Sequence, residues 1–214
     1  MKLYLSSFHL GKDPQKLKNL VSNNKRAAVI NNALDCYGNT DRVRKSKQQE
    51  LDDLKGLGLS PEDLDLRRFF GKQEELRTKI SEYGLVWVRG GSSFVLRRAM
   101  KESGFDEVLE GLSFGDSLVY AGYSVGVCVI TPTLRGVELV DDPNVIPEGY
   151  RKEIIWDGVG LVNYSFAPHY HSNHPESEAV DKLVQYYIEN NMPFRALRDG
   201  DVIVGSADRF YEGK

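Results

Sequence analysis

The segment Gly122-Tyr123-Ser124-Val125-Gly126 has the residue types of a turn that presents a nucleophile. A short apolar run precedes it, and a helix is expected to follow it. Its flanking glycines allow a sharp turn that pushes the Ser124 hydroxyl outward. The backbone N–H of Val125 would lie at the start of that helix, where developing negative charge is stabilised. The pattern favours a nucleophilic serine; a glycine-rich turn with an incidental serine is the alternative.

A second glycine-rich turn, Gly90-Gly91-Ser92-Ser93, also follows an apolar run and precedes an expected helix. Sites in open parallel sheets gather at the carboxyl ends of the strands. The N–H of Gly91 is therefore a candidate for the second donor to an oxyanion, beside that of Val125. A phosphate-binding loop is the rival interpretation, although the Lys-Ser/Thr of a P-loop and a full GxGxxG are absent. A plain turn is the simplest alternative.

A serine nucleophile needs a base, and three of the four histidines lie in APHYHSNHP, residues 167–175. The two prolines favour loop or extended structure, in which His169 and His171 would point the same way. A zinc pair is therefore an alternative, although no HExxH spacing is present. We favour His169 as a single catalytic base, because Pro168 fixes the backbone at its entry.

The base should be oriented by an acid. The candidates are Glu138, Asp141, Asp142 and Asp199, and the residues alone leave the choice among them open. Asp199 lies in a Leu-Arg-Asp-Gly turn, where an aspartate is common for purely structural reasons. Glu138 lies in a loop region bounded by prolines, where a solvated charge is the alternative.

Apolar runs alternate with longer helical patterns along the first half of the chain. Strands are predicted at residues 2–5, 26–30, 64–70, 85–88 and 117–121, and helices at 14–21, 41–54, 73–82 and from residue 93. This alternation predicts an α/β fold, a mostly parallel sheet with helices on both faces. Residues 195–204 are predicted to form a hairpin that turns at Asp199-Gly200. Residues 1–214 are interpreted as one domain.

The composition argues against nucleic acid and membranes as partners. The chain is 41% hydrophobic and 28% charged, with a formal net charge of −3. It therefore lacks the basic surface that nucleic-acid binding requires. No segment has the apolar length of a membrane span, and the N-terminus has no signal-peptide pattern, so we expect a cytoplasmic protein. Cys36 and Cys128 form no metal-ligand pattern and are expected to be free thiols.

Together, these motifs resemble peptidase E, the alpha-aspartyl dipeptidase family, whose three-layer α/β/α, flavodoxin-like fold is similar to class I glutamine amidotransferases. The resemblance rests on KLYLSS, VRGGSSFVL, YAGYSVG, PTLRG with DDPN, and FAPHY. It implies Ser124 as nucleophile, Gly91 in the oxyanion hole and His169 as base. It places the triad acid at Glu138, with Asp199 as second choice.

Two positions depart from the family pattern. Val125 replaces the usual alanine beside the nucleophile. The arginine of the family's G-E-T-R stretch, which selects aspartate, is also missing, because the corresponding stretch at residues 175–180 reads PESEAV. The resemblance therefore implies a dipeptidase fold without the cation on which aspartyl specificity depends.

The sequence thus predicts a serine hydrolase that cleaves a dipeptide or another small amide. Ser124 would attack, His169 would transfer the proton, and Glu138 or Asp199 would hold the imidazole. No metal or organic cofactor is implied, nor a nucleic-acid or membrane partner, and a monomer or homodimer is expected. A non-catalytic binding or regulatory relative on the same scaffold is the main alternative. An ordinary α/β-hydrolase ranks lower, because the chain is short for that fold.

Overall fold

A six-stranded sheet organises the molecule. The computed structural model describes residues 1–115 and 117–207, and its main sheet has the order β3-β2-β4-β5-β1-β8. The strands are β1 (Lys2–Ser6), β2 (Arg26–Ile30), β3 (Ser60–Asp63), β4 (Leu85–Val88), β5 (Val119–Tyr123) and β8 (Val202–Ser206). The first five run parallel, and β8 pairs antiparallel with β1. Their carboxyl ends therefore share one edge of the sheet.

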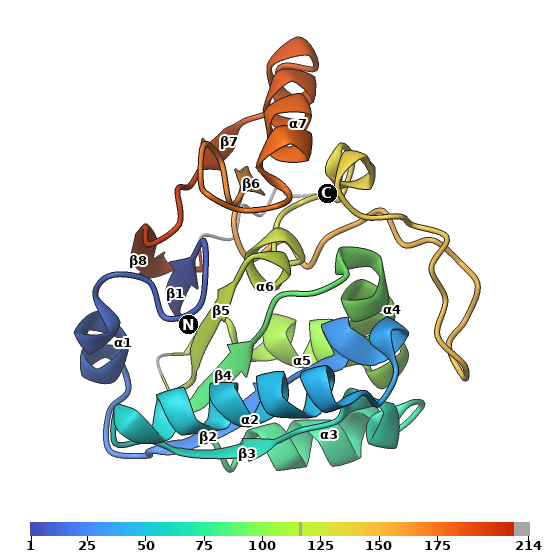
Figure 1. Cartoon of the computed structure of the whole chain (residues 1–214). Coiled ribbons are helices and arrows are strands. Elements are labelled where there is room, and N and C mark those ends of the chain that lie inside the picture. Colours follow the sequence, from blue (N-terminus) through green and yellow to red (C-terminus); the bar gives the residue numbers. More distant parts are fainter. Residues whose placement is uncertain (116, 208–214) are drawn as a thin grey trace.

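Helices cover both faces of this sheet (Figure 1). They are α1 (Pro14–Leu20), α2 (Asp41–Gly56), α3 (Gln73–Ile80), α4 (Ser93–Ser103), α5 (Phe105–Leu112), α6 (Val125–Cys128) and α7 (Ser177–Glu189), with 3-10 turns η1 (Asn32–Tyr37), η2 (Leu66–Phe69) and η3 (Val137–Leu139). Alternate strand residues enter different cores: Trp87 packs with α1 and α2, whereas Val86 and Val88 pack with α3, α4 and α5. The predicted three-layer α/β/α arrangement is confirmed.

The second half of the chain lies over the carboxyl edge of the main sheet. There β6 (Ser165–Ala167) and β7 (Phe194–Ala196) form a parallel two-stranded sheet. It packs with α7 through a small core that contains Ala167, Leu183 and Tyr187. Figure 1 shows α6, α7 and this small sheet above the ends of β4 and β5. Among the described residues, no helix combines the length and the apolar character needed to cross a membrane.

The strand predicted at residues 64–70 is wrong. The strand at this position is β3, Ser60–Asp63, and residues Leu66–Phe69 form the 3-10 turn η2. Because β3 lies at the sheet edge and is largely exposed, its sequence SPED carries no apolar signal. The apolar residues that suggested a strand instead belong to the turn, which the Asp65 carboxylate caps by accepting the Arg67 N–H.

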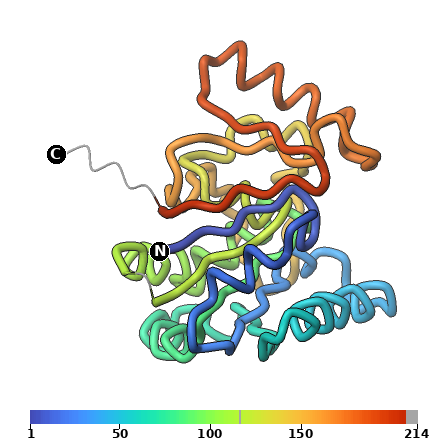
Figure 2. Tube along the Cα trace, turned by 90° about the vertical axis from the view of Figure 1, so that its left-hand side faces the viewer, coloured from blue at the N-terminus to red at the C-terminus, as the bar shows by residue number. Residues whose placement is uncertain are grey.

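The hairpin predicted at residues 195–204 is also wrong. Its two arms belong to different sheets, since β7 pairs with β6 and β8 pairs with β1. Figure 2 shows β8, in red, running beside β1, in blue. The turn at Asp199-Gly200 exists, but it connects the two sheets and brings Asp199 back to the carboxyl end of β1, where Ser7 contacts it.

The short helix α6 packs directly on β4. A Cβ added to Gly126 would lie 2.2 Å from the Val88 carbonyl oxygen, which is strand backbone and cannot move aside. We therefore predict that Gly126→Ala lowers the free energy of unfolding by about 1–3 kcal/mol or more, as overpacking of a core does. Gly56→Ala is the matched control, because nothing lies within 4 Å of that position. Urea unfolding of both variants tests this, and equal midpoints would contradict the close packing.

Candidate active site

Ser124 occupies a strained turn between β5 and α6. Its φ of 51° and ψ of −117° are unfavourable for a residue with a side chain, and such strain concentrates at functional sites. Its backbone N–H donates to the carbonyl oxygens of Ser6 and Ser7, at 3.3 and 3.1 Å. These bonds hold the turn against the end of β1. Within residues 1–115 and 117–207 the Ser124 hydroxyl makes no hydrogen bond, so it is available to a ligand.

His169 and Asp199 form a buried pair at the same edge. The distance from His169 Nδ1 to Asp199 Oδ1 is 2.7 Å, and the histidine residue is 1% exposed. Burial lowers the pKa of His169, and the hydrogen bond to Asp199 opposes that shift. The imidazole is therefore neutral near pH 7. With Nδ1 donating to the carboxylate, Nε2 is the basic nitrogen.

Ser7 connects this pair to the main sheet. Its hydroxyl accepts the backbone N–H of His169 and donates to Asp199 Oδ1, both at 2.9 Å. The Asp199 N–H in turn donates to Ser172 Oγ at 2.8 Å. Sequence reasoning gave Ser7 no role at the site. The available signal was its position, directly after β1 at the edge where β5 delivers Ser124.

The structure places Asp199, and not Glu138, beside His169. That residue lies in η3, and one of its carboxylate oxygens is buried without a hydrogen-bond partner among the described residues. The hydrogen bond of the His169 ring goes to Asp199 instead. The reason is topological: η3 packs against α7, whereas the 197–201 turn returns to the end of β1 beside the imidazole. Asp199, the second choice, occupies the position that orients a base.

The glycine loop after β4 lies against the nucleophile turn. A Cβ on Gly90 would be 3.0 Å from the Ser124 Cβ. Gly91 has a φ of 152°, which side-chain residues rarely adopt, and a Cβ there would lie 2.5 Å from the Ala33 carbonyl oxygen. The backbone N–H groups of Gly91 and Val125 find no acceptor in the described part of the chain. Both are thus free to donate to a bound oxyanion.

The other histidines of the cluster have different surroundings. The segment is a turn, with positive φ at His169 and His171, so the two side chains do not share a face as an extended segment would require. The His171 side chain is 52% exposed, and its Nε2 lies 3.5 Å from Asp181. Among the described residues, the cluster of possible metal ligands around His169 contains His174 and Glu176 but not His171, which does not support a zinc pair of His169 and His171.

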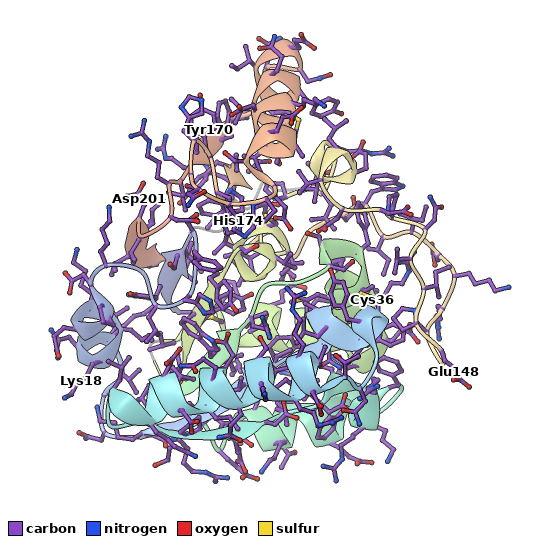
Figure 3. The ribbon with its side chains drawn as sticks, viewed as in Figure 1. Lys18, Cys36, Glu148, Tyr170, His174 and Asp201 are labelled. Carbon is purple, nitrogen blue, oxygen red and sulfur yellow. The ribbon has the colours of Figure 1, made fainter. Side chains whose placement is uncertain are left out.

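His174 instead stacks on His169, with ring centroids 3.7 Å apart and planes 8° from parallel. Figure 3 labels His174 beneath α7. Candidate ligand atoms of His169, His174 and Glu176 lie within 4.8 Å of one another. However, an imidazole binds a metal in its ring plane, and two stacked rings do not direct their nitrogens at one ion. We therefore assign no metal to this cluster.

An acidic hollow opens beside Ser124. Two carboxylates, Asp141 and Glu176, line it, and none of its lining residues is Lys or Arg. The remaining lining is Ser93, Ser124, Val125, Cys128, Val137, Val140, Pro168, Val180 and Leu183. Burial raises the pKa of Asp141, which accepts the Ser93 N–H at 2.8 Å, and raises the pKa of Glu176 to about 7. The hollow has a volume of about 20 Å3, which is room for about one water molecule, so a substrate group at its mouth meets negative charge at and above neutral pH.

Comparisons with known proteins identify a family and similar sequences. The model of peptidase family S51 matches residues 9–212. An uncharacterised peptidase of Listeria monocytogenes is 30% identical over 135 residues, which are 63% of this chain and 62% of the relative. Peptidase E of Streptomyces coelicolor is 31% identical over 136 residues, which are 61% of this chain and 52% of the relative. The chain thus matches less than two thirds of the length of either relative.

Solved structures share the fold. A Listeria monocytogenes protein assigned to peptidase E superposes with a TM-score of 0.70 at 23% identity, over 97% of this chain and 98% of that one. A peptidase from an acI-B1 actinobacterium gives a TM-score of 0.69 at 16% identity, over 96% of this chain and 83% of that one.

Because His169 is paired with Asp199, we expect the pKa of the imidazole to change when Asp199 is replaced. The carboxylate stabilises the imidazolium, so Asp199→Asn should lower the pKa of His169 further below its ordinary value. Glu138→Gln is the matched control and should leave the titration unchanged. NMR chemical shifts measured against pH test this, with the His169 signal assigned by its loss in His169→Gln. A shift in the Glu138 variant alone would reverse the assignment of the acid.

Proposed function

The chain belongs to peptidase family S51, and we propose that it is a serine peptidase that cleaves a dipeptide or another small amide. The family match and the peptidase E relatives confirm the resemblance seen in the motifs. The observation that carries the proposal is that a strained Ser124 and the His169–Asp199 pair lie at one edge of the sheet, where Ser7 is hydrogen-bonded to all three residues. Among the described residues, the Ser124 hydroxyl and the N–H groups of Gly91 and Val125 make no hydrogen bond.

The proposed reaction follows the logic of a serine triad. Ser124 Oγ attacks the scissile carbonyl carbon while His169 Nε2 takes the hydroxyl proton. Asp199 stabilises the imidazolium that forms. The N–H groups of Gly91 and Val125 bind the oxyanion of the tetrahedral intermediate. The imidazolium then gives its proton to the leaving amine, and a water molecule, activated by His169, hydrolyses the acyl-enzyme.

The acidic hollow supports a substrate preference that differs from aspartyl specificity. Glu176 and Asp141 would repel an acidic side chain beside Ser124, since a buried carboxylate needs a cation as its partner. Two cations of the surrounding elements have partners elsewhere. Arg135 stacks over the Trp156 ring at 4.0 Å, and Lys182 lies 3.8 Å from Glu178 on the surface of α7. Glu178 is exposed and does not line the hollow.

Labelling with a fluorophosphonate tests the nucleophile, because only an activated serine reacts. We predict modification at Ser124 alone, and complete loss of labelling in Ser124→Ala with the fold retained. Ser92→Ala is the matched control in the neighbouring glycine loop and should label normally. Modification at Ser92 or Ser93 in the wild-type protein would refute the assignment. Absence of labelling would favour a non-catalytic relative.

The specificity prediction compares Asp-Leu with its uncharged isostere Asn-Leu and with Leu-Leu. We expect kcat/KM for Asp-Leu to be at least about tenfold lower than for Asn-Leu, which corresponds to about 1.4 kcal/mol. The ratio of kcat/KM for Asn-Leu to kcat/KM for Asp-Leu should grow between pH 6 and pH 8, because Glu176 has a pKa of about 7 and becomes negatively charged over this range. Glu176→Gln should shrink the ratio, and Glu178→Gln should not. A preference for Asp-Leu would show that a cation from elsewhere enters the site.

A further inference from the structure

A second hollow lies between η1 and the first turns of α2. It has a volume of about 490 Å3 and is lined by Leu34, Tyr37, Thr40, Arg42, Val43, Ser46 and Arg89. Cys36, labelled in Figure 3, marks the position of η1. Unlike the acidic hollow, this one has two arginines and no carboxylate among its lining residues. We call it the arginine hollow.

Arg89 supplies an unused donor to the arginine hollow. The residue is only 8% exposed, and its Nη1 donates to Ser46 Oγ at 3.0 Å. Its Nε is buried without a hydrogen-bond partner in the described structure. A buried guanidinium N–H without an acceptor is costly, and a planar anion is the acceptor that the guanidinium geometry suits best. The unpaired Nε–H of Arg89 therefore indicates an anionic ligand.

The surrounding charges leave the arginine hollow positive. Glu50 lies behind it, buried, and accepts hydrogen bonds from Trp87 and Tyr123. Burial raises the pKa of Glu50, but His9, whose Nδ1 lies 3.6 Å away, together with Tyr123, Arg89 and Trp87, lowers it overall. Glu50 therefore carries a negative charge that balances Arg89. Arg42 is exposed and makes no ion pair among the described residues. One positive charge is thus uncompensated.

The neighbouring acids do not cancel that charge. On the same turn of α2, Asp41 is bound to Arg44. On η1, Asp35 lies 3.5 Å from Arg67 and accepts a hydrogen bond from the Tyr150 hydroxyl. Thr40 caps α2 by accepting the Val43 N–H, so the positive end of the helix dipole also faces this region.

The arginine hollow adjoins the nucleophile through the sheet. In the β4–β5 register Val88 pairs with Gly122, which sets Arg89 beside Tyr123 and one residue before the glycine loop. The Phe8 ring contacts both His169 and Tyr123, with centroids 5.7 and 6.2 Å apart. A Cβ added to Gly90, the residue after Arg89, would lie 3.2 Å from Ser124 Oγ, so Arg89 borders both the arginine hollow and the loop beside the nucleophile.

We propose that the arginine hollow binds the carboxylate of the residue that the reaction releases. This inference rests on the proposed function and defines its substrate as a peptide with a carboxylate immediately after the scissile bond. A dipeptide with a free C-terminus has that group. An acidic side chain on the released residue would supply a carboxylate as well. The acidic hollow and the arginine hollow then match the opposite charges of the two ends of such a dipeptide.

The test uses the full chain and the substrates Leu-Leu, Leu-Leu-amide and Leu-Asp-amide. We expect KM to be about tenfold higher for Leu-Leu-amide than for Leu-Leu, with kcat little changed. Arg42→Gln should raise KM for Leu-Leu several-fold and leave KM for Leu-Leu-amide unchanged. Arg44→Gln is the matched control, because Arg44 does not line the hollow. A KM for Leu-Asp-amide as low as that for Leu-Leu would support the hollow and assign the carboxylate to the side chain.

Binding without turnover separates this proposal from the reaction. Calorimetry on Ser124→Ala should show tighter binding of N-acetyl-leucine than of N-acetyl-leucinamide, and Arg42→Gln in that background should remove the difference. Equal KM values for Leu-Leu and Leu-Leu-amide, or equal binding of the two ligands, would overturn the proposal while the peptidase function stands. No hydrolysis of any substrate and no fluorophosphonate labelling would instead overturn the proposed function.

Discussion

The parallel pairing of β1 with β5 is the constraint on which the candidate site depends. It ends both strands at one edge, where the Ser124 N–H bonds to the carbonyl oxygens of Ser6 and Ser7. The Ser7 hydroxyl then bonds to His169 and Asp199. One pair of buried strands therefore positions all three groups of the proposed triad. A shift in this register would separate the nucleophile from its base.

Backbone strain at this edge is held by packing from several directions. Ser124 and His169 both have positive φ, and Gly91 adopts a conformation that disfavours a side chain. Val88 contacts α6, Ala33 contacts Gly91, and the small sheet with α7 covers the edge. Such strain persists only where the surrounding structure compensates for it. The result is a preorganised site in which the hydroxyl and two backbone donors stay unpaired.

Charge is distributed asymmetrically around the nucleophile. Asp141 and Glu176 line the hollow beside Ser124, whereas Arg89 and Arg42 line the hollow on the α2 face of the sheet. Asp141, Glu176 and Arg89 are partly or fully buried, where electrostatic interactions are stronger than in water, whereas Arg42 is exposed. A small ligand with a positive and a negative end matches this arrangement better than one with an acidic side chain at its amino end. This charge distribution is the basis of the proposed preference for short peptides bound in one orientation.

The sequence by itself determined the parallel α/β architecture, the nucleophile turn, the glycine loop and the histidine motif, because these depend on local backbone preferences and apolar periodicity. Only the tertiary structure decided which acid meets His169. Glu138 and Asp199 both lie in polar loops, and the difference between them arises because residues 197–201 return to β1 while η3 packs on α7. Local sequence also could not predict three other features: the separate sheets of β7 and β8, the stacking of His174 on His169, and the charges of the two hollows. Each brings together residues that are distant in the chain, and a contact of that kind depends on long-range packing and not on the identity of neighbouring residues.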